Sequence, residues 1–155
     1  MTYRILGLDP TPYLPLFGAP DETLTAQGIV RMRADALNAY PDRIEVRDAA
    51  IGESVLLINH LYLDVPGPYR GRHAIFVREG ATERCDVRNE VPHALSIRLL
   101  SLRGFDRSGM MIDADVIDGR AVEELIDKLF SDARVAFIHV HHARRGCYAA
   151  RIDRA

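Results

Sequence analysis

Short strand-like segments joined by turns are the feature that most constrains the fold of this chain. Alternating or continuous apolar runs of strand length recur from Tyr3 to Arg154. They occupy residues 3–8, 29–34, 43–47, 54–63, 73–78, 96–105, 110–117, 134–142 and 147–154. Many of the connections between them are as short as those of hairpins, which favours antiparallel pairing.

Only one segment has a strong helical pattern. Apolar residues from Val122 to Leu129 recur at the spacing of one helix face, and Asp118 precedes them in the position of an N-cap. Residues 21–27 form a shorter helical candidate. The sequence therefore predicts an α+β fold with a mainly antiparallel, curved or barrel-like sheet, one principal helix over about 119–131 and a C-terminal hairpin.

The clearest turn is Asp106-Arg-Ser-Gly109, because its glycine can adopt the left-handed conformation that closes a short hairpin loop. With three residues in the loop, Arg103 would lie opposite Asp113, and Ser101 opposite Asp115. Such pairs would give both carboxylates ordinary cross-strand partners. We prefer this interpretation to a pair of acid/base carboxylates.

Size and composition limit the class of protein. The chain has 155 residues, of which 48% are hydrophobic and 27% charged, which matches one globular domain over residues 1–155. A formal charge of −2 gives no general basic surface for nucleic acid, and no apolar run approaches the ~18 to 20 residues of a membrane span. We expect a cytoplasmic protein without nucleic-acid or membrane partners, in which Cys85 and Cys147 are reduced.

Chemically reactive side chains are concentrated in the segment His139-Val-His-His-Ala-Arg-Arg-Gly-Cys-Tyr148. Alternate residues of a strand share a face, so His139 and His141 point one way and His142 points the other. Groups suited to metal binding, acid/base chemistry, anion binding and nucleophilic attack occur together here. This mixture predicts a functional site at the end of a strand.

Two registers are possible for the final hairpin. A four-residue loop sets His142 opposite Cys147 and His139 opposite Ala150. A three-residue loop instead sets His139 opposite Arg151. The sequence does not choose between them.

One use of the segment is metal binding. Two imidazoles at positions i and i+2 of a strand, with Cα atoms about 7 Å apart, can converge on one ion. His139 and His141 would need a third ligand, for which His73, Asp113 and Asp115 are candidates. The arginines that follow place like charge beside such an ion, so the metal site is an alternative, and no cofactor is indicated.

A second use is the binding of a small anionic molecule, because guanidinium groups match carboxylate or phosphate through paired hydrogen bonds. Two basic clusters, one before the strand at 73–78 and one in the final turn, would form a positive pocket if they lie at the same end of the sheet. Its ligand-binding residues would be Tyr69, Arg70, His73, Arg144, Arg145 and Tyr148. This anion site is the leading hypothesis.

A third use is nucleophilic chemistry at Cys147, whose thiolate would be favoured by Arg145 or a protonated His142. The competing explanation is a small buried cysteine. The candidate catalytic residues are His139, His141 and Cys147.

A non-enzymatic use is also open. The hairpin would then be an interaction or homodimer surface, with its arginines and Tyr148 as anchors. No GxxxxGK, GxGxxG or GxSxG pattern occurs, so nucleotide-binding and serine-hydrolase folds lose their usual support.

Three stretches carry a resemblance to a known family. They are Tyr69-Arg70 followed by His73-Ala-Ile-Phe-Val-Arg78, then Met110-Met-Ile-Asp-Ala-Asp115, and His139 through Arg154. Together they resemble a bacterial family of domains of unknown function over nearly the whole chain, most specifically in Ala-Arg-Arg-Gly-Cys-Tyr. The resemblance implies a small, single-domain, cytoplasmic bacterial protein, and it implies no reaction, cofactor or catalytic residue.

Overall fold

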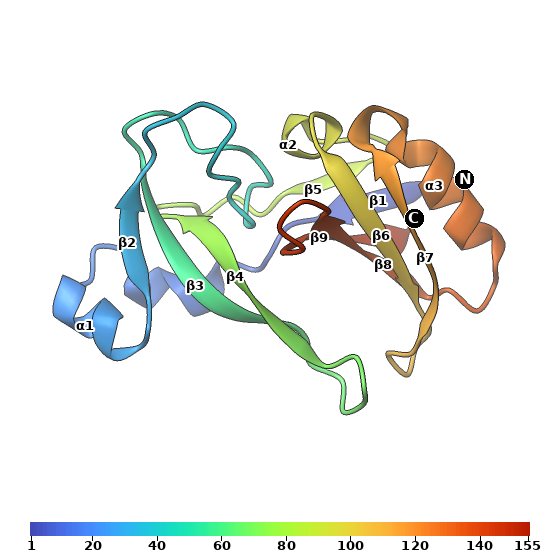
Figure 1. Ribbon diagram of the computed structural model, residues 1–155, viewed down its shortest axis with the longest axis horizontal. Coiled ribbons are helices and arrows are strands. Elements are labelled where there is room, and N and C mark those ends of the chain that lie inside the picture. The colour runs from blue at the N-terminus through green and yellow to red at the C-terminus, as the bar shows by residue number, and fades with distance from the viewer.

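Nine strands form two antiparallel sheets in the computed structural model, which describes residues 1–155 (Figure 1). The larger sheet has six strands in the order β5-β1-β9-β8-β6-β7. These are β1 (Tyr3–Leu6), β5 (Asp86–Arg88), β6 (Leu99–Phe105), β7 (Met111–Asp118), β8 (Phe137–His142) and β9 (Tyr148–Arg154). The smaller sheet has the order β2-β3-β4, with β2 (Val30–Arg33), β3 (Ser54–Leu63) and β4 (Gly71–Arg78).

Helices are few and short. They are α1 (Asp21–Ala26), α2 (His93–Ser96) and α3 (Val122–Ser131), with 3-10 turns at Thr11–Leu16 and Gly119–Ala121. The Asp118 carboxylate accepts a hydrogen bond from the Arg120 amide at 2.9 Å, so it caps the 3-10 turn that leads into α3, whereas the N-cap position of α3 itself is Ala121, which has no side-chain cap. None of the helices has the length and apolar character needed to cross a membrane.

The predicted α+β class with mainly antiparallel sheet is confirmed, whereas the barrel-like alternative is wrong. The larger sheet is open, with β5 and β7 at its two edges. The helix α3 covers one face of this sheet (Figure 1), where Leu125, Ile126 and Leu129 join the largest apolar cluster. Its other face carries the aromatic and histidine side chains that meet the smaller sheet.

Two β-bulges set the hairpin registers. In the final hairpin His142 donates its amide to the Cys147 carbonyl at 2.9 Å, whereas His139 lies opposite Arg151. The register of the four-residue loop therefore holds next to the turn, and that of the three-residue loop holds from Val140 back to Phe137. The register changes between Val140 and His141, where Ala149 is the bulge residue without a partner on β8. A four-residue turn precedes the bulge, and Gly146 closes that turn at φ +76°.

A β-bulge also changes the register of the β6–β7 hairpin. The loop is short as predicted, with the Asp106 amide donating to the Met110 carbonyl at 2.9 Å. A bulge beyond it moves Asp113 opposite Gly104 and Asp115 opposite Leu102. The predicted pairing of these carboxylates with Arg103 and Ser101 is therefore wrong.

The predicted strand at 43–47 is wrong as well. The Asp42 carboxylate accepts hydrogen bonds from the amides of Glu45 at 2.6 Å and Arg78 at 2.8 Å. Val46 has a φ of +53°, which no strand contains. This segment is instead a tight loop.

Backbone hydrogen bonds fix that loop against the larger sheet. Leu8 donates to the Arg43 carbonyl and Cys85 to the Ile44 carbonyl, each at 2.8 Å. A Cβ on Gly7 would lie 2.0 Å from the Ile44 carbonyl oxygen, so only glycine permits this approach. The close contact holds Arg43 at the site described below.

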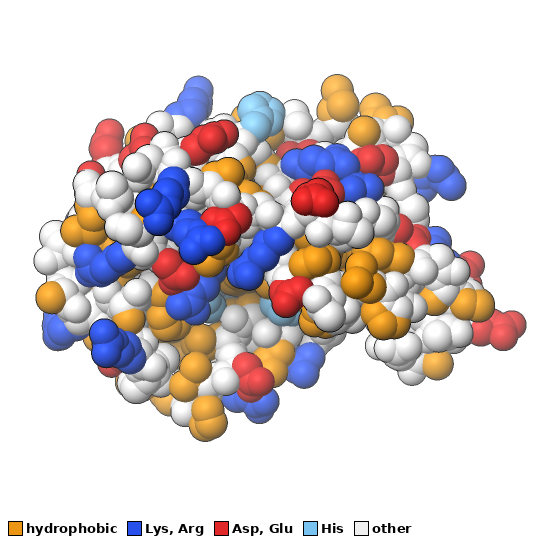
Figure 2. All heavy atoms as spheres, turned by 180° about the vertical axis from the view of Figure 1, so that it is seen from behind, with side chains coloured by type: hydrophobic (Ala, Val, Ile, Leu, Met, Phe, Trp, Pro, Cys, Tyr) orange, Lys and Arg blue, Asp and Glu red, His pale blue; other side chains and the backbone are white.

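Figure 2 shows the opposite face of the molecule from Figure 1, with basic and acidic side chains intermixed across it. This agrees with the formal net charge of −2 and the absence of a general basic surface.

Candidate functional site

A cavity of about 920 Å³ lies beside the β8–β9 turn and is lined by residues of both sheets. The smaller sheet supplies Met32, Leu57 and Phe76, and loop residues up to Arg43 close one side. The segment from His93 to Leu99 and the turn from His142 to Cys147 complete the wall. The lining arginines and histidines are Arg43, His73, His93, Arg98, His142, Arg144 and Arg145.

No aspartate or glutamate lines this cavity. Arg98 forms an ion pair with Asp48, a residue that does not line the cavity. The two terminal nitrogens of Arg98 lie 2.9 and 2.6 Å from the Asp48 carboxylate oxygens. Arg144 and Arg145 are exposed and make no hydrogen bond or ion pair within the protein. The cavity therefore has excess positive charge and two unpaired guanidinium groups.

Arg43 is a buried cation, only 2% exposed. Its Nε donates to the Tyr148 carbonyl at 2.7 Å, Nη1 donates to the Pro41 carbonyl, and Nη2 donates to Cys147 Sγ at 3.1 Å. Burial lowers the pKa of Arg43, while the nearby Cys147 and Asp42 oppose that effect. No carboxylate forms a salt bridge with this guanidinium.

His142 lies across the hairpin from Cys147 and is 8% exposed. Burial, followed by the charges of Arg43 and Arg98, lowers the pKa of His142 to about 3. The ring is therefore neutral near pH 7, and its Nδ1 is buried without a hydrogen-bond partner. The cation that donates to Cys147 Sγ is Arg43, whereas the sequence predicted Arg145 or a protonated His142 for this role.

His139 and His141 lie in a separate layer between the sheets and do not line the cavity. The ring of Tyr62 stacks on His73 at 5.1 Å and on Tyr148 at 6.1 Å, and meets the edge of His141 at 5.1 Å. His73 lines the cavity too, so it connects the two groups.

Both histidines of this layer are neutral near pH 7. Burial lowers the pKa of His139 to about 3 and that of His141 to about 4. His141 donates from Nδ1 to the Gly146 carbonyl at 2.8 Å, which leaves Nε2 as an unpartnered buried acceptor. This layer therefore contains buried ring nitrogens that have no hydrogen-bond partner within the protein.

The structure does not assemble the predicted metal site. No three His, Cys, Asp or Glu side chains are placed together so that they could hold an ion. The ring centroids of His139 and His141 are 6.4 Å apart, and those of His73 and His141 are 5.7 Å apart. Asp115 is exposed and bonds Lys128 at 3.0 Å, on the edge strand β7.

Three of the six predicted ligand-binding residues do not line the cavity. Arg70 lies in the β3–β4 loop and pairs with Asp64 at 2.9 Å. Tyr69, in the same loop, packs against Phe105 at 6.0 Å between ring centroids. Tyr148 is 4% exposed and is covered by other rings. The remaining three are His73, Arg144 and Arg145, and they do line the cavity.

Comparison with known families gives one match. The family described as "Protein of unknown function (DUF1203)" matches residues 39–154. The chain belongs to this family. The predicted resemblance to a family of unknown function is therefore confirmed, and the DUF1203 match includes every residue that lines the cavity except Met32 and Asn38. No curated protein and no solved structure matches the chain.

Arg43 and Arg98 are the cavity residues of this DUF1203 protein that the sequence did not reveal. Arg43 lies in a run that alternates like a strand, and Arg98 follows the short helix α2. Neither is close in sequence to the final turn, so no local spacing signals that they meet Cys147 or His142. Their positions in the cavity wall depend on tertiary contacts of the 41–48 loop, which contains Arg43 and the Asp48 that pairs with Arg98.

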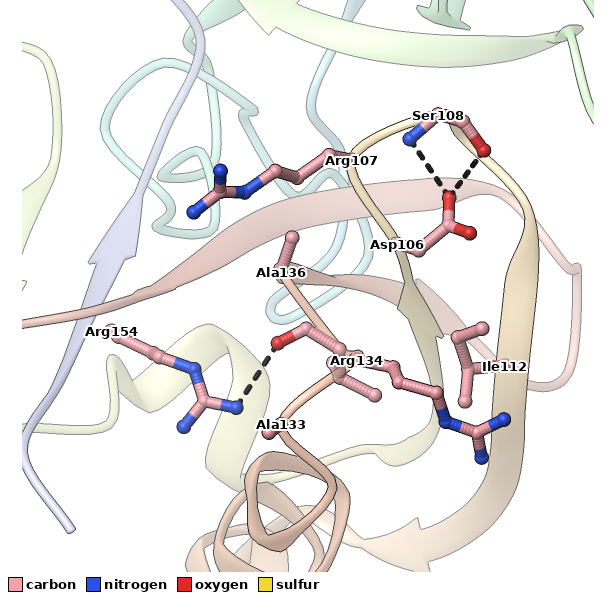
Figure 3. Close-up of a pocket in the computed structure, with 9 residues that line it drawn as sticks. Asp106, Arg107, Ser108, Ile112, Ala133, Arg134, Ala136 and Arg154 are labelled. Atoms are coloured by element: carbon pink, nitrogen blue, oxygen red, sulfur yellow. Dashed lines mark hydrogen bonds between the residues drawn. The ribbon is translucent and has the colours of Figure 1, made fainter.

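A second cavity, of about 600 Å³, lies at the β6–β7 turn of this DUF1203 protein (Figure 3). Asp106 belongs to its lining and accepts a hydrogen bond from the Ser108 hydroxyl at 2.7 Å. Arg134 pairs with Asp132 at 2.7 Å, and Arg154 donates to the Val135 carbonyl at 3.0 Å. Arg134 and Arg154 are thus engaged within the protein, unlike Arg144 and Arg145, whereas Arg107, the third arginine of this lining, makes no such bond.

Proposed function

We propose that the protein binds a small molecule carrying a carboxylate or phosphate group in the cavity beside the β8–β9 turn. The observation that carries this proposal is a lining with four arginines and no carboxylate. Arg144 and Arg145 have free donors that match the oxygens of such a group. Pairing there would satisfy guanidinium groups that the protein leaves unpaired.

The size and the apolar wall of the cavity indicate the rest of the ligand. About 920 Å³ lies within the range of roughly 300 to 1,000 Å³ that is usual for small-molecule sites. Met32, Leu57 and Phe76 from the smaller sheet make part of the lining apolar. This combination favours an anionic head group attached to an apolar body.

The other hypotheses have weaker support. A metal-dependent reaction at His139 and His141 lacks a third ligand. A homodimer surface anchored on Tyr148 conflicts with the burial of that side chain. The bacterial origin, the cytoplasmic location and the absence of nucleic-acid or membrane partners stay predictions from the sequence.

An anion panel tests the proposed function. Carboxylates and phosphate esters of increasing apolar size are compared with their neutral amides and alcohols, with the melting temperature as the readout. At a ligand concentration of 100 Kd, binding adds about 2.7 kcal/mol to the free energy of unfolding. At least one anion should therefore raise Tm by several degrees, and its neutral counterpart should not.

Paired variants locate the binding. We expect Arg144→Gln/Arg145→Gln to remove the Tm shift, because these are the two guanidinium groups in the lining of this cavity that make no hydrogen bond or ion pair within the protein. The matched control is Arg107→Gln/Arg134→Gln, which removes two arginines from the second cavity. A shift that survives in the first variant and disappears in the control would refute the proposed location.

A further inference from the structure

We propose that Cys147 is a nucleophile that attacks an electrophilic carbon of the anionic ligand, forming an S–C bond as the bond to a leaving group breaks and that group departs with the electron pair, and that Arg43 favours the thiolate by donating to its sulfur. The inference rests on the proposed function, because Arg144 and Arg145 would hold the charged group of that ligand in the cavity that Cys147 lines. The substrate class is a small carboxylic acid or phosphate ester with a reactive carbon near the charged group.

The contact between Arg43 and Cys147 is the first support. Nη2 of Arg43 lies 3.1 Å from Cys147 Sγ, and the guanidinium is buried with two carbonyls and this sulfur as its acceptors. A buried guanidinium without a carboxylate in hydrogen-bond contact is costly, so a negative charge on its one ionisable acceptor would compensate it, beyond the contribution of the nearby Asp42. A cationic donor at sulfur is the usual environment of reactive cysteines.

His142 provides a second, independent support. The residue is 8% exposed, it lines the same cavity, and its Nδ1 has no partner within the protein. His142 and Cys147 face each other across the hairpin. An unpartnered ring nitrogen of a residue in the wall of this cavity is accounted for if a ligand forms a hydrogen bond with it.

Cys85 shows what an unactivated cysteine in this protein looks like. Burial, together with the charges of Asp86 and Glu90, raises the pKa of Cys85 to about 11. Both cysteines are partly accessible and neither forms a disulfide. Cys85 is therefore an internal control for the reactivity of Cys147.

Iodoacetate is a probe of the proposed step. The Cys147 sulfur attacks the methylene carbon, the new S–C bond forms as the C–I bond breaks, and iodide leaves with the electron pair. The carboxylate is unchanged and would pair with Arg144 or Arg145. Iodoacetamide undergoes the same substitution without the negative charge, so it is the matched neutral reagent.

The experiment measures alkylation rates of the full chain by peptide mass spectrometry, with a cysteine-containing reference peptide in the same tube. We expect Cys147 to react at least about tenfold faster than Cys85 and the reference. Relative to the reference peptide, Cys147 should favour iodoacetate over iodoacetamide. Arg43→Met should reduce the Cys147 rate to that of the reference.

Two further results separate this inference from the proposed function. The variant Arg144→Gln/Arg145→Gln changes only exposed turn residues, and it should lose the preference for iodoacetate while Cys147 still reacts rapidly with iodoacetamide. A Cys147 that reacts no faster than Cys85 would overturn the nucleophile and leave anion binding to be judged by the Tm panel. Rapid reaction without any preference for iodoacetate would overturn the anionic substrate class instead.

Discussion

Acidification from pH 7.5 to 4.5 is expected to lower the free energy of unfolding by an amount on the order of 8 kcal/mol, because three buried histidines stay neutral in the folded state. Burial lowers the pKa of His139 and His142 to about 3 and that of His141 to about 4, and the pKa of the half-buried His60, also lowered to about 4, adds to the same effect. In the unfolded chain these groups titrate near 6.5. A loss of this size is comparable to the total stability of a small domain.

The sign follows from proton binding. Between the unfolded and folded pKa values, the unfolded chain binds more protons than the folded protein, so stability falls as the pH falls. The loss begins near pH 6.5 and continues until the folded values of about 3 to 4 are reached. Each histidine contributes about 1.4 kcal/mol per pH unit in this window. Most of the window lies above the range in which ordinary carboxylates titrate.

Urea denaturation at pH 7.5, 6.5, 5.5 and 4.5 measures the effect. In His141→Asn, the slope of the free energy of unfolding against pH should decrease by about one quarter, because His141 is one of four histidines whose pKa is lowered to about 3 or 4, and this holds whatever the stability of the variant at pH 7.5. The exposed His93 provides the control, because His93→Gln should leave the slope unchanged. An unchanged slope in His141→Asn would contradict the burial of a neutral ring.

Removal of Arg43 should have the second large effect. Arg43→Ala is expected to destabilise the protein by about 3 to 5 kcal/mol, because it opens a cavity in the core and leaves the Tyr148 and Pro41 carbonyls without their donors. Arg43→Met should destabilise it less, by about 1 to 2 kcal/mol, because a side chain of similar length fills the space and no charge is buried.

Chemical denaturation of the two variants and the wild type checks this order. If Arg43→Met were as destabilising as Arg43→Ala, the hydrogen bonds of the guanidinium would dominate over packing. If both variants were as stable as the wild type, the buried position of Arg43 would be wrong. Arg33, which is exposed and bonds only the Gly52 carbonyl, supplies the control Arg33→Met.

The periodicity of the sequence predicted most elements of the fold but missed the hairpin registers. The apolar stripe of α3 and the turn at Gly109 depend on neighbouring residues, and both were confirmed. Each register changes at a bulge, at Ala149 in one hairpin and at Ile112 in the other. A bulge is set by packing across the sheet, so strand alternation alone does not reveal it.

The candidate site was predicted in part for a similar reason. The final turn is local in sequence, and its Arg144 and Arg145 do line a cavity. Arg70 was expected beside them because it precedes a strand. It lies instead in the β3–β4 loop, where it pairs with Asp64. The cavity lining contains Arg43 instead, which is held there by contacts with Tyr148 and Cys147, more than 100 positions away in the sequence.

Calorimetric titration with the best anion of the panel tests the central claim most directly. Its Kd is measured for the wild type, for Arg144→Gln/Arg145→Gln and for Arg107→Gln/Arg134→Gln at one fixed salt concentration. Hydrogen bonds to charged groups contribute about 1.5 to 3 kcal/mol each, so the turn variant should raise Kd at least about tenfold. The other variant should leave Kd unchanged. A Kd in the turn variant equal to that of the wild type would show that the β8–β9 turn is not the anion site.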